Sequence, residues 1–344
     1  MAQRLYSAHN RALTVLLSDL ESYALSQTEV FVGTAGSVIE RPKTDGTRFY
    51  SHQFYDGDGK KRERSIGGPV GSAEADAAAA RLQERIRELK DLVPSLRMLG
   101  REGFNLVDAK TYATLASLHN HGIFTAGGML IGSHAYGVLL NHLGVRAAAY
   151  ATEDIDIARR GSLAFKTLPE AGFLQMLQES GIEFVEVPQL DARQPATSFK
   201  QRGRSLFHVD LLVPSPDETF PIVPVPELKA HATGLPYLAY LLGESQMSMV
   251  MAREGCCAVR VPLPERFAVH KLVVSNLRVG RAAKADKDVL QACVLCAALS
   301  ERQPGALEEA VALLPASARK HLAAALVAAL PYLEEHPRAR EELG

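Results

Sequence analysis

The feature that most constrains this chain is a set of aspartates inside apolar, strand-like segments. Asp154 and Asp156 alternate with isoleucines in EDIDIA, and Asp210 lies within HVDLL. Side chains two apart on a strand share a face, so the carboxylates of EDIDIA project together while the isoleucines point into the core. Neighbouring carboxylates repel one another and lose hydration unless a cation lies between them. Because oxygen ligands suit hard cations, the pattern predicts a site for Mg²⁺ or Mn²⁺.

A Gly-Ser pair precedes these aspartates at a predicted turn from strand to helix. GGMLIG is strand-like and HAYGVLLNHLG is helical, which places Gly132 and Ser133 at the junction. Backbone N–H groups and the positive end of the helix dipole can face an anion there, and Ser133 adds a hydroxyl donor. His134 either contacts a phosphate or fills the first helical turn. Each feature alone is common, but their order together predicts phosphoryl or nucleotidyl transfer.

This order resembles the Gly-Ser, Asp-x-Asp and third-carboxylate signature of the DNA polymerase beta-like nucleotidyltransferase superfamily. GSHAYG, followed by LGVR and T-x-DID, is more specifically similar to bacterial nucleotidyltransferase-fold proteins. Toxin and abortive-infection nucleotidyltransferases are more distant relatives. The close resemblance covers roughly residues 120–300. One departure is the interval between Ser133 and Asp154, which is longer than is usual in the superfamily.

The resemblance implies Mg²⁺-dependent transfer of a nucleoside monophosphate from an NTP to an acceptor hydroxyl, with release of pyrophosphate. It implies that Gly132 and Ser133 hold the triphosphate and that Asp154 and Asp156 bind the metal ions. Asp210 would complete one metal site or act as general base. RNA, in particular tRNA, is the leading acceptor by analogy with the toxin-type relatives, and protein is the next.

Several basic or histidine side chains near these motifs each have two interpretations. In the toxin-type relatives a lysine after the core can reach the phosphates, and the matching residue in PERFAVHKLVVS is Lys271, which is otherwise a solvated helical lysine. Lys284 and Lys287 either form a charged surface or act directly. His208, two positions before Asp210, either bonds a carboxylate or is a satisfied core histidine.

Two basic clusters suggest contact with nucleic acid. Residues 193–204 contain no acid and carry Arg193, Lys200, Arg202 and Arg204. Residues 41–64 interleave basic side chains with aromatic ones, a combination that suits a phosphate backbone and stacked bases. Solvated hairpin faces have the same composition, so that alternative stays open.

The composition is that of an ordinary globular protein. Lys+Arg 38 against Asp+Glu 39 excludes a generally basic nucleic-acid coat, and 47% apolar with 22% charged residues excludes disorder and coiled coils. Four cysteines provide no disulfide framework, and Cys293 and Cys296 are predicted as buried thiols in a packed helix rather than zinc ligands. The first apolar run is too short for an export signal, and the uncharged stretch 111–145 is rich in polar groups. We therefore expect a cytoplasmic protein without membrane contact.

The chain is predicted to be α/β (α+β) with three parts. Residues 1–120 hold an N-terminal helix, a small antiparallel β meander between Glu29 and Ile66, and helices opened by Ser72 and Asp108. Residues 121–228 form a nucleotidyltransferase core with a mixed β-sheet, in which a basic loop precedes HVDLL. Residues 229–344 form a helical domain. Beyond Val223 we expect helices apart from a strand at CCAVRVPLP, and a solvated tail at EEHPRAREELG.

Three other functions remain possible from the sequence. A non-catalytic binding module on the same fold is the first alternative, although all three aspartates are present. A metal-dependent glycosyltransferase also uses Asp-x-Asp, but it does not explain the Gly-Ser turn or Asp210. A nuclease would degrade RNA without any NTP. The preferred base and the oligomeric state are not predicted.

Overall fold

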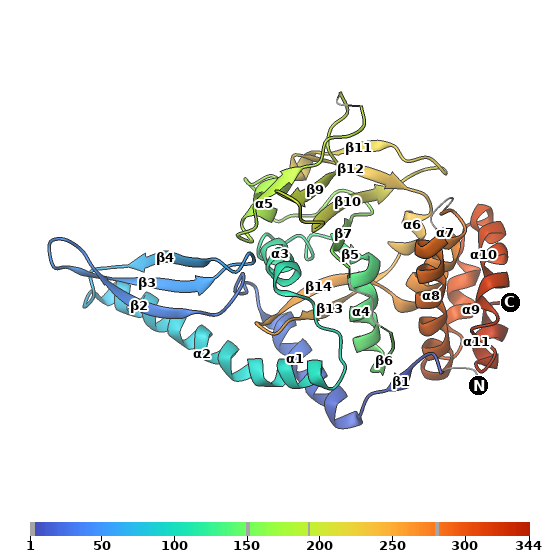
Figure 1. Cartoon of the computed structure of the whole chain (residues 1–344), viewed down its shortest axis with the longest axis horizontal. Helices are drawn as coiled ribbons and strands as arrows, with labels where there is room; N and C mark the ends of the chain where they lie inside the picture. The colour runs from blue at the N-terminus through green and yellow to red at the C-terminus, as the bar shows by residue number, and fades with distance from the viewer. Residues whose placement is uncertain (1–3, 149–151, 192, 279–281) are drawn as a thin grey trace.

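The computed structural model describes residues 4–148, 152–191, 193–278 and 282–344. Figure 1 shows a body built of a mixed β-sheet and a group of C-terminal helices, from which an arm extends on the left. The arm consists of the β meander and part of a long helix beneath it. The predicted α+β class, with a mixed sheet, an N-terminal meander and a helical C-terminal region, is confirmed.

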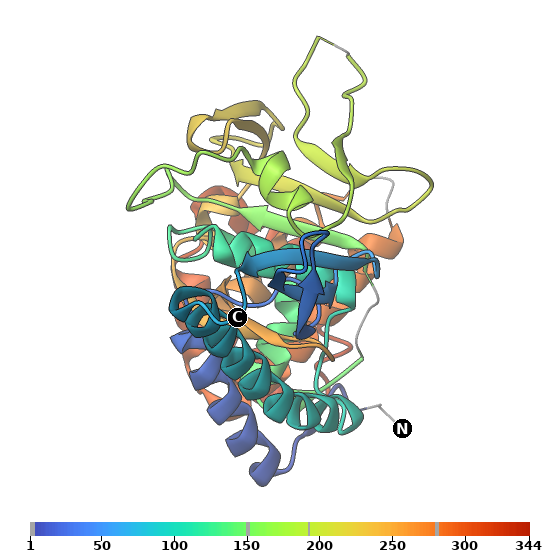
Figure 2. The same ribbon diagram turned by 90° about the vertical axis from the view of Figure 1, so that its left-hand side faces the viewer.

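The arm is made by the N-terminal part of the chain. The N-terminal elements are β1 (Ser7–Ala8), α1 (Arg11–Ser26), β2 (Ser37–Pro42), β3 (Arg48–Tyr55), β4 (Lys61–Gly67) and α2 (Ala73–Arg101), of which the three strands β2, β3 and β4 and part of α2 form the arm. The strands pair antiparallel in the order β2-β3-β4, as the alternation of turn and strand segments predicted. Ser72 caps α2, and Ile86 and Leu89 of that helix pack beneath the meander. Figure 2 looks along the arm and shows α1 and α2 side by side.

The central sheet carries the predicted site. Its strands and the helices between them are α3 (Ala109–Asn120), β5 (Met129–Ile131), α4 (Gly132–His142), β6 (Val145–Arg146), β7 (Asp154–Ala158), α5 (Phe173–Gln178), β8 (Phe184–Glu186), β9 (Ser198–Gln201), β10 (His208–Pro214), β11 (Ile222–Val225), η1 (Pro226–Leu228) and β12 (Ala230–Leu235). The order is β11-β12-β10-β7-β5, with β9 pairing the start of β10 and β8 pairing β9. β10 runs parallel to β7 and β12, whereas β5 and β9 run antiparallel to their neighbours. β6 pairs separately with β1.

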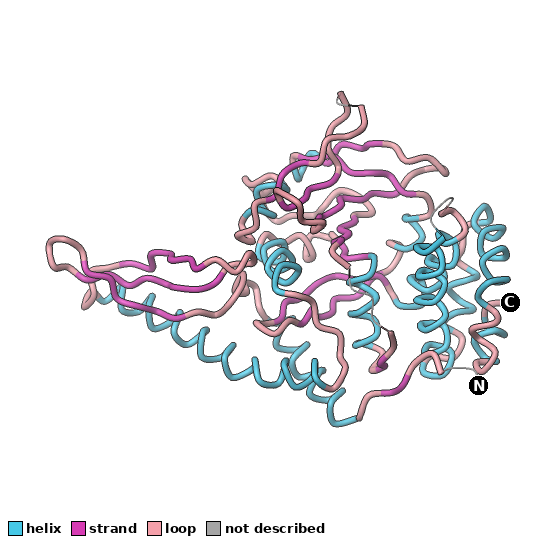
Figure 3. The backbone as a smooth tube through the Cα atoms, viewed as in Figure 1, coloured by secondary structure: helices cyan, strands magenta, loops and turns pink. Residues whose placement is uncertain are grey.

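The remaining elements enclose the other side of the core. They are α6 (Leu238–Leu241), β13 (Ser245–Met251), β14 (Cys256–Pro262), α7 (Pro264–Ser275), α8 (Ala282–Arg302), α9 (Ala306–Ala312), α10 (Ala316–Ala329) and α11 (Pro337–Glu342). The hairpin β13-β14 packs beside β5 and α1. Figure 3 shows the C-terminal helices gathered at one end of the molecule. Most of α7 and the middle of α8 are buried, so one apolar core runs from the sheet into these helices.

Three predictions about secondary structure were wrong. The chain beyond Val223 is not helical at first, because β11, β12 and β13 precede the predicted strand at β14. The predicted domain boundary at residue 228 falls between the paired strands β11 and β12. The basic loop before HVDLL contains β9. The C-terminal tail is packed rather than solvated, since Ala339 and Leu343 are buried against the preceding helices.

Other local predictions hold. Asp108 caps α3 by accepting hydrogen bonds from Lys110 and Thr111, as its position before the helix indicated. All four cysteines are buried free thiols, and Cys293 and Cys296 lie in the packed helix α8. Within the described part of the chain, no helix combines the length and apolar character needed to cross a bilayer.

Candidate active site

The three predicted aspartates meet at one edge of the central sheet. Asp210 on β10 lies directly opposite Asp156 on the parallel strand β7, and Asp154 begins β7 opposite His208. The intervening Ile155 and Ile157 are almost fully buried, whereas the aspartates are only partly buried. The alternation of EDIDIA therefore separates the two faces of the strand as expected, with apolar side chains in the core and the carboxylates on the opposite face.

Gly132 is fitted against one of these carboxylates. It adopts a left-handed backbone conformation with φ +69°, and a Cβ atom built on it would lie 2.0 Å from Oδ2 of Asp156. An L side chain at this position would be strained and would also collide with the carboxylate. Glycine thus permits the turn from β5 into α4 to pass directly beside Asp156.

The first turn of α4 is open to an anion. Ile131 precedes the helix and provides no side-chain cap, so the N–H groups of the first turn lack the partner that Asp108 supplies to α3. Ser133 is partly exposed at this end. Orphan N–H groups and the helix dipole together favour a negatively charged ligand.

His134 lies beside the same turn and is held neutral. Burial is the main cause that lowers the pKa of His134 to about 4. The charges of Asp108 and Asp154 raise this pKa, and the charge of Lys287 lowers it. Its Nε2 atom is buried and has no hydrogen-bond partner among the described residues. The imidazole lines a pocket of about 240 Å³ together with Ser133 and Asp108.

Charge is incompletely balanced at Asp156. Burial raises the pKa of Asp156 to about 6, and the neighbouring carboxylates of Asp210 and Asp154 raise it further. The positive charges of Lys271 and His208 oppose this increase. Three carboxylates at one sheet edge thus create a site in which added positive charge is favourable.

Asp210 differs from Asp156 because it has donors. Burial alone would raise the pKa of Asp210, but contacts from His208 and Ser198 outweigh burial and lower it. The Ser198 hydroxyl, on β9 directly opposite in register, donates to Oδ1 of Asp210. Ser198 was not identified from the sequence, because its role depends on pairing between β9 and β10.

His208 lies between two carboxylates. Its Nδ1 is 3.4 Å from Oδ1 of Asp154, and its Nε2 is 3.5 Å from Oδ2 of Asp210. The side-chain contact with Asp210 is the largest cause that raises the pKa of His208 to about 9. His208 therefore contacts carboxylates, which was one of the two interpretations of this residue from the sequence.

The donor set suits a hard cation in its chemistry. Asp154, Asp156 and Asp210 offer carboxylate oxygens from neighbouring positions of two strands, which are the ligands that Mg²⁺ prefers. Among the described residues, no three acidic, histidine or cysteine side chains are grouped tightly enough to enclose an ion. The imidazolium of His208 lies between Asp154 and Asp210 and partly balances their charge.

Lys271 is not a solvated helical lysine. It is buried in α7, and its Nζ lies 2.6 Å from Oδ1 of Asp288 on α8. Asp288 is buried as well and also accepts from Nε of Arg278. Lys271 therefore joins α7 to α8. Its positive charge also lowers the pKa of Asp156 in the candidate site.

Two other lysines on α8 act electrostatically on the groups of the site. The charge of Lys284 lowers the pKa of Asp210, and Lys287 interacts electrostatically with Asp154 and His134. Positions three apart on a helix share a face, so both lysines point from the same side of α8. The interpretation of these residues as a charged surface is thus incomplete, because that surface borders the site.

The basic segment before β10 lies at the same edge. Lys200 is paired in register with His208, while Arg193 and Arg202 form ion pairs with Asp191 and Glu183. Arg204 is exposed in the turn between β9 and β10. β9 then connects to the arm, because Gln201 donates to Asp58 and accepts from Lys110. These links were not predicted, since they join segments far apart in the sequence.

Comparison with known proteins identifies the family. A family model described as nucleotidyltransferase matches residues 109–314, which is more than half of the chain. The matched region begins at α3 and includes β5, α4, β7 and β10, and thus every element that carries the three aspartates and the Gly-Ser turn. No curated protein and no solved structure matches the chain. On the family match and the arrangement of its core, this chain belongs to a nucleotidyltransferase family.

Proposed function

We propose that this protein transfers a nucleoside monophosphate from an NTP to a hydroxyl group of RNA, with Mg²⁺ as cofactor and pyrophosphate as the second product. The observation that carries this proposal is the meeting of Asp154, Asp156 and Asp210 beside the uncapped first turn of α4. One part of the site suits metal cations and the adjacent part suits a polyphosphate anion. The reaction needs both.

Each part of the site has a distinct task in this proposal. The N–H groups after Gly132 and the hydroxyl of Ser133 bind the triphosphate and orient it in line with the acceptor. Asp154 and Asp156 would hold the metal ions together with Asp210, and Mg²⁺ supplies neutralisation of the charge that develops on the phosphate. Asp210, whose pKa is lowered, remains ionised and can accept the proton of the acceptor hydroxyl.

The basic groups at the rim supply further positive charge for the nucleotide. Lys284 and Lys287 act electrostatically on the groups of the site from α8, and His134 borders the same turn. Lys271 contributes through its charge from within the α7–α8 contact rather than from an exposed position. Lys200 on β9 lies opposite the first residue of β10, and Arg204 is exposed in the turn between the two strands; these charges favour a polyanionic acceptor such as RNA over an uncharged one.

The experiment uses each α-labelled NTP in turn with Mg²⁺ and total cellular RNA or lysate protein. We expect label to enter RNA with the wild-type protein, and to be lost with Asp154→Ala/Asp156→Ala or when EDTA replaces Mg²⁺. Asp19→Ala, an exposed substitution on α1, is the matched control and retains transfer.

The alternatives give different results. Label in protein would replace RNA as the acceptor, and transfer of a sugar from a nucleotide sugar would indicate a glycosyltransferase. RNA degradation without NTP would indicate a nuclease. A folded wild-type protein that transfers nothing from any NTP would overturn the proposal and favour a binding module.

A further inference from the structure

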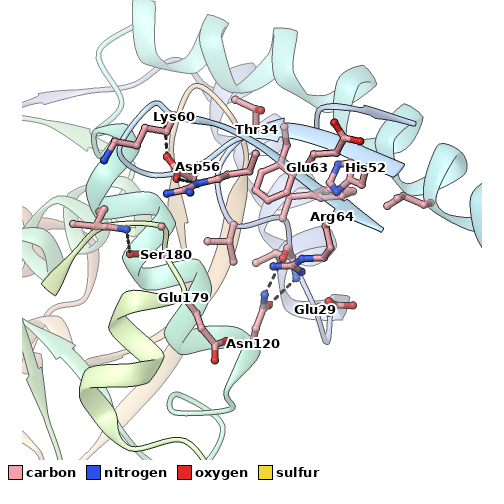
Figure 4. Close-up of a pocket in the computed structure, with 18 of the residues that line it drawn as sticks. Glu29, Thr34, His52, Asp56, Lys60, Glu63, Arg64, Asn120, Glu179 and Ser180 are labelled. Carbon is pink, nitrogen blue, oxygen red and sulfur yellow. Dashed lines mark hydrogen bonds and ion pairs between the residues drawn. The ribbon is translucent and has the colours of Figure 1, made fainter. Parts of the chain in front are cut away.

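A second concave site lies where the arm meets the body. It is a pocket of about 770 Å³ between the meander, α2, the end of α3 and the segment that joins α5 to β8. Figure 4 shows Thr34, His52 and Arg64 on one side of this pocket, with Asn120, Glu179 and Ser180 on the other. Its volume lies in the range of pockets that hold organic ligands. We refer to it below as the arm groove.

Aromatic rings form one wall of the arm groove. His52 and Phe54 share a face of β3 and stack with centroids 4.8 Å apart, and Phe31 lies 5.7 Å from His52. Guanidinium groups lie over the two ends of this row: Arg64 is 5.9 Å from the ring of Phe54, and Arg85 is 5.1 Å from that of Phe31. His52 is buried within this row, so the partly exposed ring of Phe54 and the exposed guanidinium of Arg64 are the groups that a base can stack on.

The acidic side chains of the arm groove are already partnered. Asp56 and Glu29 form ion pairs with Arg62 and Arg85 of the groove itself. The others have partners outside it: Glu63 and Glu183 form ion pairs with Arg41 and Arg202, and Glu179 contacts the imidazole of His121. Arg64 has no ion pair with any described residue, so its charge is available to a phosphate.

The turn at one end of the arm groove is anchored to the body and to β9, the strand that carries Ser198. The turn between β3 and β4 rests on the body, where the N–H of Gly57 donates to Ser180 at 3.0 Å and Asp58 accepts from Gln201 at 2.8 Å. Gln201 lies three residues along β9 from Ser198, the residue that donates to Asp210. Three residues of a strand span about 10 Å.

We propose that the arm groove binds the unpaired segment of the acceptor nucleic acid, with a base stacked on Phe54 and a phosphate held by Arg64. This inference rests on the proposed function for the identity of the strand as acceptor, but binding itself requires no transfer. The strand register places the basic and aromatic residues of the meander on two opposite faces. Phe54 and Arg64 face the groove, whereas Tyr55 and Lys61, a directly opposed pair on the same two strands, face away.

The test measures binding of a fluorescein-labelled twelve-nucleotide single strand by anisotropy, without NTP, to the full-length protein. We expect Phe54→Ala/Arg64→Ala to weaken binding about tenfold or more, because base stacking and a phosphate contact are both lost. The matched control Tyr55→Ala/Lys61→Ala leaves affinity unchanged. Phe54→Trp retains binding and Phe54→Leu does not, which separates stacking from simple burial. Circular dichroism of each variant verifies folding.

Different probes identify the class of ligand that the arm groove binds. Oligoribonucleotide, oligodeoxyribonucleotide and duplex probes distinguish RNA from DNA and from paired strands; we expect single-stranded RNA to bind best. Absence of single-strand binding by the wild type, or equal loss in the probe and control variants, overturns the inference. So does binding of an extended peptide in place of nucleic acid.

The inference and the proposed function can fail separately. The variant Asp154→Ala/Asp156→Ala binds the single strand like wild type if the arm groove is the binding site. Groove-dependent binding without any transfer would overturn the proposed function alone. Transfer to RNA that Phe54→Ala/Arg64→Ala leaves unaltered, with unchanged KM for the RNA, would overturn the inference alone.

Discussion

Asp288 and Asp156 show two ways in which a folded chain treats a carboxylate. Asp288, 2% exposed, accepts from Lys271 and Arg278 and is enclosed by its own cations. Asp156 has two carboxylates as neighbours, with His208 and Lys271 as incomplete compensation. Removal of a buried carboxylate from its two cationic partners destabilises the fold, whereas a group of carboxylates with incomplete compensation itself costs stability.

The largest expected effect tests the structural side of this comparison. Asp288→Asn removes the countercharge of Lys271 and Arg278, and we expect the free energy of unfolding to fall by about 3 kcal/mol, since breaking a buried ion pair leaves an uncompensated charge. Urea unfolding measures this change. Asp286→Asn, exposed on the same helix, is the control and changes stability by less than about 0.5 kcal/mol. A similar effect of both substitutions would contradict the comparison.

Asp156→Asn should impair nucleotidyl transfer without lowering the stability of the fold. We expect nucleotidyl transfer to fall at least about a hundredfold, as when a group that stabilises developing charge is removed. The free energy of unfolding should stay the same or rise, because repulsion with Asp154 and Asp210 is relieved. The measurements are transfer rate and urea unfolding on one preparation. A loss of stability as large as that of Asp288→Asn would assign Asp156 a structural role.

Gly132→Ala sharpens the site side of the comparison. The new Cβ would lie 2.0 Å from Oδ2 of Asp156, on a backbone with φ +69°. We expect a stability loss of about 1–2 kcal/mol from the left-handed conformation and a loss of transfer from displacement of the carboxylate. Gly161→Ala, where a Cβ meets nothing within 4 Å, is the control. Transfer by Gly132→Ala at the wild-type rate would show that the close approach is unimportant.

The remaining effect concerns pH and the cationic surroundings of α7. Burial lowers the pKa of His270 to about 3, Lys271 and Arg278 lower it further, and Asp288 opposes them. The unfolded chain binds this proton near pH 6.5, so its stabilising contribution is complete above that pH and is lost as pH falls toward 3. We expect a loss of about 1.4 kcal/mol per pH unit in this window.

The matching variant isolates that contribution. His270→Leu removes the titrating group, so its free energy of unfolding should depend less on pH between 6.5 and 5 than that of wild type. The comparison of slopes is independent of any change in absolute stability. Equal slopes for the two proteins would show that His270 takes up its proton in the folded state.

The sequence predicted which groups of the candidate site lie together better than it predicted the surrounding fold. The alternation in EDIDIA, the Gly-Ser turn and the apolar segment HVDLL depend on local periodicity, and the structure brings all three to one edge. β11, β12 and β13 were missed because short strands containing Pro224 or Gly234 have weak local preferences, and pairing with distant strands determines them. The packed tail was missed because two inward residues, Ala339 and Leu343, are outnumbered by charged ones.

Residues that act through long-range contacts could not be predicted. Lys271 and Asp288 lie on different helices, and nothing local indicates that they pair. Ser198 reaches Asp210 only because β9 pairs with β10. The meander cluster was visible as basic and aromatic residues, but its division into two faces, with Phe54 toward the groove and Tyr55 away, requires the strand register and the position of the body.

By itself, the sequence determined the chemistry of this protein: which side chains carry charge, which alternate with apolar residues, and where a strand turns into a helix beside a Gly-Ser pair. Tertiary structure alone decided which charges are neutralised within the fold and which are not. Asp288 finds two cations and Asp156 finds other carboxylates, and this difference arises because electrostatic partners are set by distance in space rather than by separation along the chain.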